Sequence, residues 1–314
     1  MVNKTRNKRA INTIEQATKD FLAQSKSKLK ESTFSRYSFI CERHIIPYFK
    51  GMNLDRLNTE SINNFVQYKL NNGGLTSKPM SPKTINDMTC LLLQIAKSYC
   101  KLDITIDKLS YNQNEISIFT ESEYNKLKAY LTIGTDSKKL GIIVAMLTGV
   151  RIGELCALKW ENINLDSGVI TIDKTMQRIK ITADIEKAKT RIIIDKPKSN
   201  ASTRAIPIPE ILLHKLQGFK SSNNTYLLTN TTDYIEPRIY QRHFKGYLQA
   251  CSIRDNNFHT LRHTFATMAI SRGVDIKTVS LLLGHTDISF TMKRYVHPNM
   301  EHKRQQMEKL AIDF

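Results

Sequence analysis

The sequence predicts a mainly α-helical protein of two domains, with a small antiparallel sheet in the second (class α+β). Apolar residues recur at helical spacing from Ile11 to about Lys101, and no segment there has the pattern of a strand. A polar stretch without periodicity follows from Asp103 to Ser117, as expected of a linker. Three short runs rich in β-branched residues appear after it. A length of 314 residues, 40% of them hydrophobic, is enough for two cores of ordinary size.

The first domain is predicted over residues 11–102, after a basic segment over residues 1–10. It has about four helices. Residues 71–74, Asn-Asn-Gly-Gly, form a strong helix stop, and Ser81 with Pro82 begins the last helix as N-cap and first-turn proline. Several basic side chains between the apolar stripes form either a solvated face or contacts to phosphates: Lys26, Lys28, Lys30, Arg36 and Arg43.

The second domain is predicted over residues 118–298, after a linker over residues 103–117. Thr120 and Glu123 have the spacing of a capping box, and helices follow as far as Gly149. The runs 169–172, 191–194 and 205–208 are then expected to form strands of one antiparallel sheet. Helical patterns return at about Glu210, Pro237, Leu261, Ile276 and Ile288. The tail 299–314 is expected to be an amphipathic helix that contacts a neighbouring protomer.

The charge balance indicates a polyanionic partner. Lys+Arg minus Asp+Glu is 47 − 29 = +18, and binding to phosphates releases condensed counterions. No stretch approaches the roughly 18 apolar residues of a membrane span, and the basic N-terminus leads into no apolar signal segment, so a cytoplasmic location is expected. The scattered cysteines, without a Cys-x-x-Cys pair, favour reduced thiols over a metal site: Cys41, Cys90, Cys100, Cys156 and Cys251.

Four segments of the second domain carry polar groups in a distinctive order. The first, 148–155, is a glycine turn that places Arg151 in the first turn of a helix, with Glu154 three residues later. The others are 197–200, which contains Lys198; 259–267, which contains His259 and Arg262; and 283–297, which contains His285 and Tyr295.

Together these ordered motifs resemble those of the tyrosine recombinases, also called the phage-integrase family. The resemblance covers about residues 115–314, and the helical first domain looks like the family's core-binding (SAM-like) domain. It implies a catalytic set with Tyr295 as nucleophile, and a supporting role for Glu154: Arg151, Lys198, His259, Arg262, His285 and Tyr295. Lys189 and Lys196 lie near Lys198, so the identity of the lysine is open.

The implied set suits transesterification at a phosphodiester. Two guanidinium groups can bind the non-bridging oxygens and stabilise the charge that develops on them. Tyrosine, with a pKa of about 10, needs cations and a base to act as a nucleophile. His259 is a candidate to take its proton or bind the phosphate, Lys198 to protonate the leaving 5′ oxygen, and His285 to hold a phosphate oxygen. The resemblance implies a 3′-phosphotyrosyl intermediate and no metal or other cofactor.

Each of these residues alone has a simpler structural explanation. Tyr295 fits a half-buried position on an amphipathic helix, and Lys198 fits a DNA-backbone contact, as do Lys196 and Arg204 nearby. Arg151 and Glu154 have the spacing of an ordinary helix ion pair. The ordered set of motifs favours the active site over these separate explanations.

The sequence is therefore interpreted as a site-specific recombinase. The resemblance implies that two domains clamp double-stranded DNA, and that a homo-tetramer exchanges strands through a Holliday junction. DNA-bending accessory factors are further candidate partners. The motif at 151–154, the long segment 174–204 and the Lys/Asn/Ile-rich composition favour a mobile-element integrase over a Xer-type chromosome-dimer resolvase. A type IB topoisomerase, a hydrolytic nuclease and a non-catalytic DNA-binding regulator are the alternatives.

Overall fold

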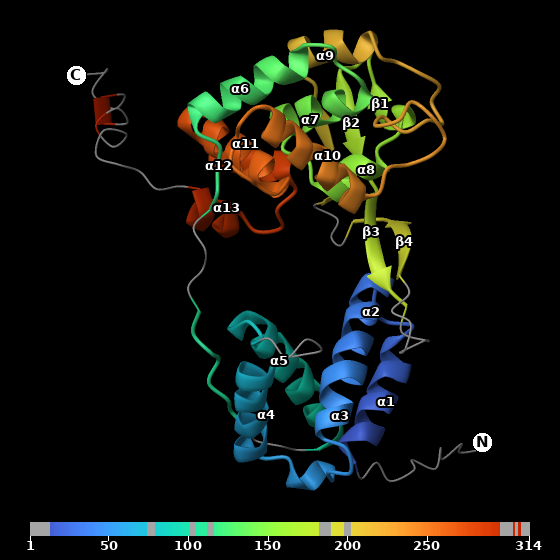
Figure 1. The fold of residues 1–314 in the computed structure, drawn as a ribbon, viewed down its shortest axis with the longest axis vertical. Coiled ribbons are helices and arrows are strands. Elements are labelled where there is room, and N and C mark those ends of the chain that lie inside the picture. The colour runs from blue at the N-terminus through green and yellow to red at the C-terminus, as the bar shows by residue number, and fades with distance from the viewer. Residues whose placement is uncertain are drawn as a thin grey trace, which may run out of the picture. The chain divides into compact units, whose positions relative to one another are not determined.

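The computed structural model (Figure 1) describes residues 13–73, 79–100, 104–111, 116–181, 190–197 and 202–295, together with 304, 307 and 308. The chain divides into two compact units: residues 1–114 with 179–191, and residues 115–178 with 192–314. The division at 114/115 falls inside the predicted linker, and residues 104–111 adopt neither helix nor strand. The predicted basic segment 1–10 and most of the predicted tail helix 299–314 lie outside the described residues.

The N-terminal part of the first unit is helical, as predicted. Its helices are α1 (Ile14–Ser25), α2 (Glu31–Ile40), a π-helical turn (Cys41–Ile45), α3 (Ile46–Tyr48), a 3-10 turn (Leu54–Arg56), α4 (Thr59–Asn72) and α5 (Pro82–Tyr99). The side chain of Ser81 accepts a hydrogen bond from the amide of Thr84, and Pro82 occupies the first turn of α5. Helix α4 ends before Gly73, whose φ is +64°. The predicted start and stop signals are therefore confirmed.

The second unit places helices around two small sheets. Its elements are α6 (Glu121–Thr132), α7 (Ser137–Thr148), α8 (Ile152–Ala157), β1 (Ile163–Asn164), β2 (Val169–Ile172), β3 (Thr175–Lys180), β4 (Thr190–Asp195), β5 (Arg204–Pro207), α9 (Glu210–Gln217), α10 (Pro237–Ala250), α11 (His259–Ser271), α12 (Ile276–Leu283) and α13 (Ile288–Tyr295). Strands β3 and β4 extend past residues 178 and 191, where the two units divide. Helix α7 is buried along most of its length and packs against α6, α9 and α11, so it forms the centre of the core.

The sheet prediction was wrong in one respect. Strands β1, β2 and β5 form a three-stranded sheet in which Ile170 pairs with Ile163 on one side and Ile206 on the other, antiparallel to both. The predicted strand at 191–194 is part of β4, which instead pairs with β3 in a separate two-stranded sheet (Figure 1). The sequence of β3, Thr-Met-Gln-Arg-Ile-Lys, is too polar to stand out as a strand, so the partner of β4 was missed.

Within the described residues, no helix is long and apolar enough to cross a membrane.

Candidate active site

Three arginines from three separate elements meet in the second unit. Arg151 is the N-cap of α8, Arg204 begins β5, and Arg262 lies on α11. The carboxylate of Glu154, only 2% exposed, joins the first two of these arginines. Its Oε1 accepts hydrogen bonds from Arg151 Nη1 (2.7 Å) and Arg204 Nη1 (3.2 Å). Its Oε2 accepts from the Arg151 amide (2.9 Å) and Arg204 Nη2 (2.9 Å).

The same three arginines bind the last carbonyls of α12. Arg204 Nε donates to the carbonyl oxygen of Leu282 at 2.6 Å, and Arg262 Nη2 donates to that of Leu283 at 2.6 Å. Arg151 Nη2 donates to the carbonyl oxygen of Gly284 at 3.4 Å. The last carbonyls of a helix lack partners within it and carry the negative end of its dipole. The carbonyl groups at the end of α12 therefore orient all three guanidinium groups.

Gly149 explains why a glycine turn precedes Arg151. It ends α7 with a φ of +66°, a conformation that favours glycine. A Cβ there would lie 2.6 Å from Phe265 Cδ1 and 2.9 Å from Leu283 Cδ2. The carbonyl oxygen of Gly149 accepts a hydrogen bond of 2.8 Å from Arg262 Nη1. The backbone of this turn thus positions Arg262, and the turn places Arg151 at the start of α8.

His285 follows the end of α12 and is held on both ring nitrogens. Its Nε2 lies 2.9 Å from Arg262 Nη2, and its Nδ1 lies 2.8 Å from the hydroxyl of Thr291, which is fully buried. A guanidinium can only donate, so Nε2 accepts and the proton of the neutral ring is on Nδ1, which donates to Thr291. Burial, followed by the charges of Arg262 and the neighbouring arginines, lowers the pKa of His285 to about 3. The ring is neutral at pH 7.

The cluster of Glu154 and the three arginines carries a net positive charge. Burial alone raises the pKa of Glu154, but the hydrogen bonds and charges of Arg204 and Arg151 outweigh it, so the pKa lies below its ordinary value. Glu154 is therefore ionised at pH 7. One carboxylate among three arginines leaves a net charge of +2, because His285 is neutral. Such a centre suits the binding of an anion with several oxygens, such as a phosphate.

The remaining predicted residues are placed as follows. His259 begins α11, one turn before Arg262; its ring is exposed and lies edge-on to that of His263, with centroids 4.4 Å apart. A proton on His259 also lowers the pKa of His285, so the two histidines lie in one electrostatic environment. Tyr295 is the last residue of α13, a helix that packs on α11 and α12; its side chain is not described. Lys198 lies outside the described residues.

The predicted DNA contacts in the first unit lie near α1 and α2. Lys26, Lys28 and Lys30 are exposed in and around the connection between these helices. Arg36 is exposed and paired with Asp87, and Arg43 is half-buried. The three lysines are thus placed on a surface that a phosphate can reach.

Arg204 differs from its predicted role as a DNA contact. Its side chain is 6% exposed, and all three guanidinium nitrogens donate to Glu154 or to backbone carbonyls. The sequence does contain a pattern that predicts this inward position. Arg204 is two residues before the buried Ile206, so the alternation of side chains along a strand places both on the inward face of β5. Thr291, the partner of His285, was also missed. No pattern in the sequence marks it.

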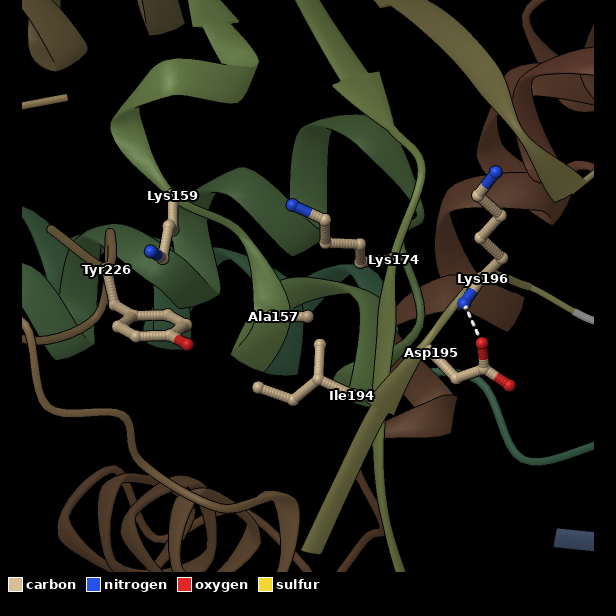
Figure 2. A pocket seen from close by; sticks show the side chains of 7 residues that line it. All are labelled: Ala157, Lys159, Lys174, Ile194, Asp195, Lys196 and Tyr226. Atoms are coloured by element: carbon tan, nitrogen blue, oxygen red, sulfur yellow. Dashed lines mark hydrogen bonds between the residues drawn. The ribbon is translucent and has the colours of Figure 1, made fainter. Parts of the chain in front are cut away.

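The second unit also contains a pocket of about 330 Å³ (Figure 2), and none of the three arginines lines it. It is lined by Ala157, Lys159, Lys174, Ile194, Asp195, Lys196 and Tyr226. Lys159 Nζ donates to Asn224 Oδ1 at 2.7 Å, and Lys174 Nζ lies 3.7 Å from Glu161 Oε1. The exposed Lys196 is at its edge, where its amide donates to the carboxylate of Asp195 (Figure 2). Among the described residues, no group of three or more His, Cys, Asp or Glu is placed to bind a metal ion.

The family model "Phage integrase family" matches residues 117–302, and the model "Phage integrase, N-terminal SAM-like domain" matches residues 13–70. The chain therefore belongs to the phage integrase family, the tyrosine recombinases, whose members cut and rejoin DNA strands. The resemblance inferred from the four motifs is confirmed, as are the fold class and the assignment as a DNA-rejoining enzyme.

Relatives of two kinds are similar to the chain. The tyrosine recombinase XerC-like protein of Caldanaerobacter subterraneus subsp. tengcongensis is 28% identical, over 90% of this chain and 78% of the relative. The ICEBs1 integrase of Bacillus subtilis (strain 168) is 21% identical, over 92% of this chain and 80% of the relative.

Solved structures share the fold at low identity. A fragment of the Tn1549 transposon integrase, in complex with transposon right end DNA, has a TM-score of 0.75 at 19% identity, covering 95% of this chain and 99% of that one. The lambda integrase dimer bound to a COC′ core site has a TM-score of 0.63 at 17% identity, covering 90% of this chain and 77% of that one.

Proposed function

We propose that this recombinase is the integrase of a mobile element, and that it acts through a covalent 3′-phosphotyrosyl intermediate formed by Tyr295. The observation that carries the chemical part of this proposal is the centre formed by Arg151, Glu154, Arg204 and Arg262, with its net charge of +2. A scissile phosphate bound there receives guanidinium hydrogen bonds on its non-bridging oxygens, where negative charge develops during transesterification.

Each proposed residue has a separate part in the reaction. Arg151 and Arg262 bind the phosphate, and neutral His285 accepts a hydrogen bond from Arg262 Nη2 and so orients that guanidinium towards it. His259, one helical turn before Arg262, accepts the phenolic proton of Tyr295. The tyrosine oxygen forms a bond to phosphorus while the bond from phosphorus to the 5′ oxygen breaks, and Lys198 protonates that leaving oxygen. The bond energy is kept in the phosphotyrosyl link, so rejoining by a 5′-hydroxyl needs no nucleotide cofactor.

The assembly follows from the same chemistry. Two duplex sites carry four strands, and exchange of all four requires four nucleophiles, so a homo-tetramer that passes through a Holliday junction is proposed. The two units, together with the exposed Lys26, Lys28 and Lys30, would bind double-stranded DNA on both sides of the cleavage position. The tail 299–314 is proposed to contact a neighbouring protomer.

The relatives include integrases and Xer-type recombinases, so the mobile-element assignment rests on the motif at 151–154, the long segment 174–204 and the composition. The ICEBs1 integrase is one of these relatives, and the Tn1549 transposon integrase, which shares the fold, was solved with transposon right end DNA. The XerC-like relative, at 28% identity, keeps a Xer-type resolvase as the second candidate.

The target DNA distinguishes these two functions. The protein is incubated with nicked duplexes made from its source genome, the covalent complexes are purified under denaturing conditions, and the attached DNA is sequenced. Junctions at the two ends of one element would support an integrase, whereas a single chromosomal site far from any such element would favour the resolvase. Labelling each end of the cleaved strand identifies whether its 3′ phosphate is attached to protein, and attachment at a 5′ phosphate would contradict the proposed mechanism.

A further inference from the structure

Arg204, whose side chain is 6% exposed, is not a member of the catalytic set, yet it touches the same carboxylate as Arg151 and the same helix end as Arg262. We propose that Arg204 is a positioning residue of the active site, which compensates the charge of Glu154 and fixes the end of α12. Arg151 and Arg262 then keep the charge and orientation that a scissile phosphate requires. This inference rests on the proposed function of the site.

The first part of the proposal concerns charge. Glu154 is ionised and buried, and each of its oxygens accepts hydrogen bonds from both Arg151 and Arg204. With Arg151 as its only partner, the carboxylate would form a neutral pair and cancel the charge of a phosphate-binding arginine. The guanidinium of Arg204 adds a second positive charge, so Arg151, Glu154 and Arg204 together carry a net charge of +1. An anion at Arg151 is attracted by that remaining charge.

The second part concerns geometry. Arg204 Nε binds the carbonyl of Leu282, next to the carbonyls of Leu283 and Gly284 that orient Arg262 and Arg151. His285 follows directly on this turn. Without Arg204, the carbonyl of Leu282 loses its side-chain donor, and the turn that positions two arginines and a histidine becomes less constrained.

Direct contact with DNA does not explain the placement of Arg204. Its nitrogens already donate four hydrogen bonds: two to Glu154, one to the carbonyl of Ser202 and one to that of Leu282. The strand presents the side chain inward, and 6% of it is exposed. A residue in this position acts on the phosphate through Glu154 and α12.

The test separates positioning from DNA binding. Arg204→Met, Arg204→Lys and the double variant Arg204→Met/Glu154→Gln are compared with the wild type on a nicked duplex that contains the target site. Two quantities are measured: the dissociation constant for DNA as a function of salt, and the single-turnover rate of covalent adduct formation at saturating DNA. Thermal unfolding of each variant shows whether it is folded.

For Arg204→Met we expect a dissociation constant within about 3-fold of wild type and an adduct rate lower by about 100-fold, as for loss of a group that stabilises transition-state charge. Arg204→Lys keeps the charge without the planar fork and should give an intermediate rate. The double variant should recover about 10-fold over Arg204→Met, because Glu154→Gln removes the carboxylate that otherwise cancels the charge of Arg151; this is the coupling expected of contacting residues.

Arg254→Met is the matched control. Arg254 also donates to a carboxylate, that of Glu123, and to a backbone carbonyl, that of Ile118, but its side chain is 54% exposed and binds none of the active-site groups described above. It should cleave at the wild-type rate.

Other outcomes would overturn the inference. Weaker binding by Arg204→Met with a shallower salt dependence and a normal adduct rate would make Arg204 a phosphate contact. An unchanged adduct rate, or a double variant no faster than the single one, would contradict charge compensation. If Arg204→Met does not fold, the rate of Arg204→Lys decides: a wild-type rate contradicts a requirement for the guanidinium fork. Absence of an adduct with the wild type would contradict the proposed function itself.

Discussion

The hydroxyl of Thr291 lies 2.8 Å from Nδ1 of His285, and this contact ties α13 to the end of α12. Thr291 is one helical turn before Tyr295, so the helix that ends at the proposed nucleophile is anchored to the proposed phosphate site. The same hydrogen bond fixes the tautomer of His285, whose other nitrogen accepts from Arg262.

Thr291→Val should slow cleavage without preventing DNA binding. Valine keeps the shape of threonine but removes the acceptor for Nδ1–H of His285, which leaves the ring free to rotate or change tautomer. We expect an adduct rate lower by about 10-fold, by analogy with the hydrogen-bond partners that orient metal-bound histidines. Thr291→Ser keeps the hydroxyl and should restore most of the rate. Equal rates for Val and wild type would show that the contact does not orient the ring.

The stability of the protein should fall as pH is lowered from about 6.5 towards 3, in part because of His285. Its pKa is about 3 in the folded protein and close to 6.5 in the unfolded chain, so in this window the unfolded state binds the additional proton. The stability that the neutral ring contributes is thus present above the unfolded pKa and lost as pH falls.

The measurement is denaturant unfolding of wild type and His285→Gln at pH 5 and pH 7. The variant should show the smaller loss of stability between them, with part of the loss retained because burial also lowers the pKa of His44 to about 4. His214→Gln removes an exposed histidine and should behave like wild type. A steeper pH dependence in His285→Gln would contradict the proton assignment.

Gly149→Ala should lower stability by about 2 kcal/mol or more and also reduce cleavage. An alanine has to adopt a positive φ, and its Cβ meets Phe265 and Leu283 at less than 3 Å. Thermal unfolding and adduct formation report the two effects. Gly246→Ala is the control, because this helical glycine of α10 has open space around a new Cβ and should give neutral or increased stability.

Replacement of Lys26, Lys28 and Lys30 by glutamine should weaken DNA binding and make it less dependent on salt. Each phosphate contact contributes about 0.9 to the slope of log K against log salt concentration, so three lost contacts reduce the slope by roughly 3. The adduct rate at saturating DNA should not change. Lys19→Gln, which removes a lysine already paired with Glu15, is the control. An unchanged slope in the triple variant would identify the lysines as a solvated face.

Local signals in the sequence were enough for the helices but not for the contacts between elements. The capping residues Thr120 and Ser81 mark real helix starts, because caps depend on neighbours a few residues away. The pairing of β4 with β3 depends on a polar strand that has no distinctive pattern of its own. The motifs identified Arg151, Arg262 and His285, which the fold brings together.

The role of Arg204 depends on contacts with residues that are distant in the sequence. A basic residue in a basic segment was interpreted as a DNA contact, although the alternation with Ile206 favoured an inward position. Its partners, Glu154 and Leu282, are 50 and 78 residues away in sequence, so only the fold identifies them.

The central claim is that Tyr295 becomes covalently joined to DNA. The direct measurement is incubation of wild type and Tyr295→Phe with nicked target duplex, without nucleotide or divalent metal, followed by denaturing electrophoresis and mass spectrometry of the peptide attached to DNA. We expect an adduct with wild type alone, carried by the peptide that contains Tyr295. An adduct on another residue, or an equal amount with Tyr295→Phe, would contradict it.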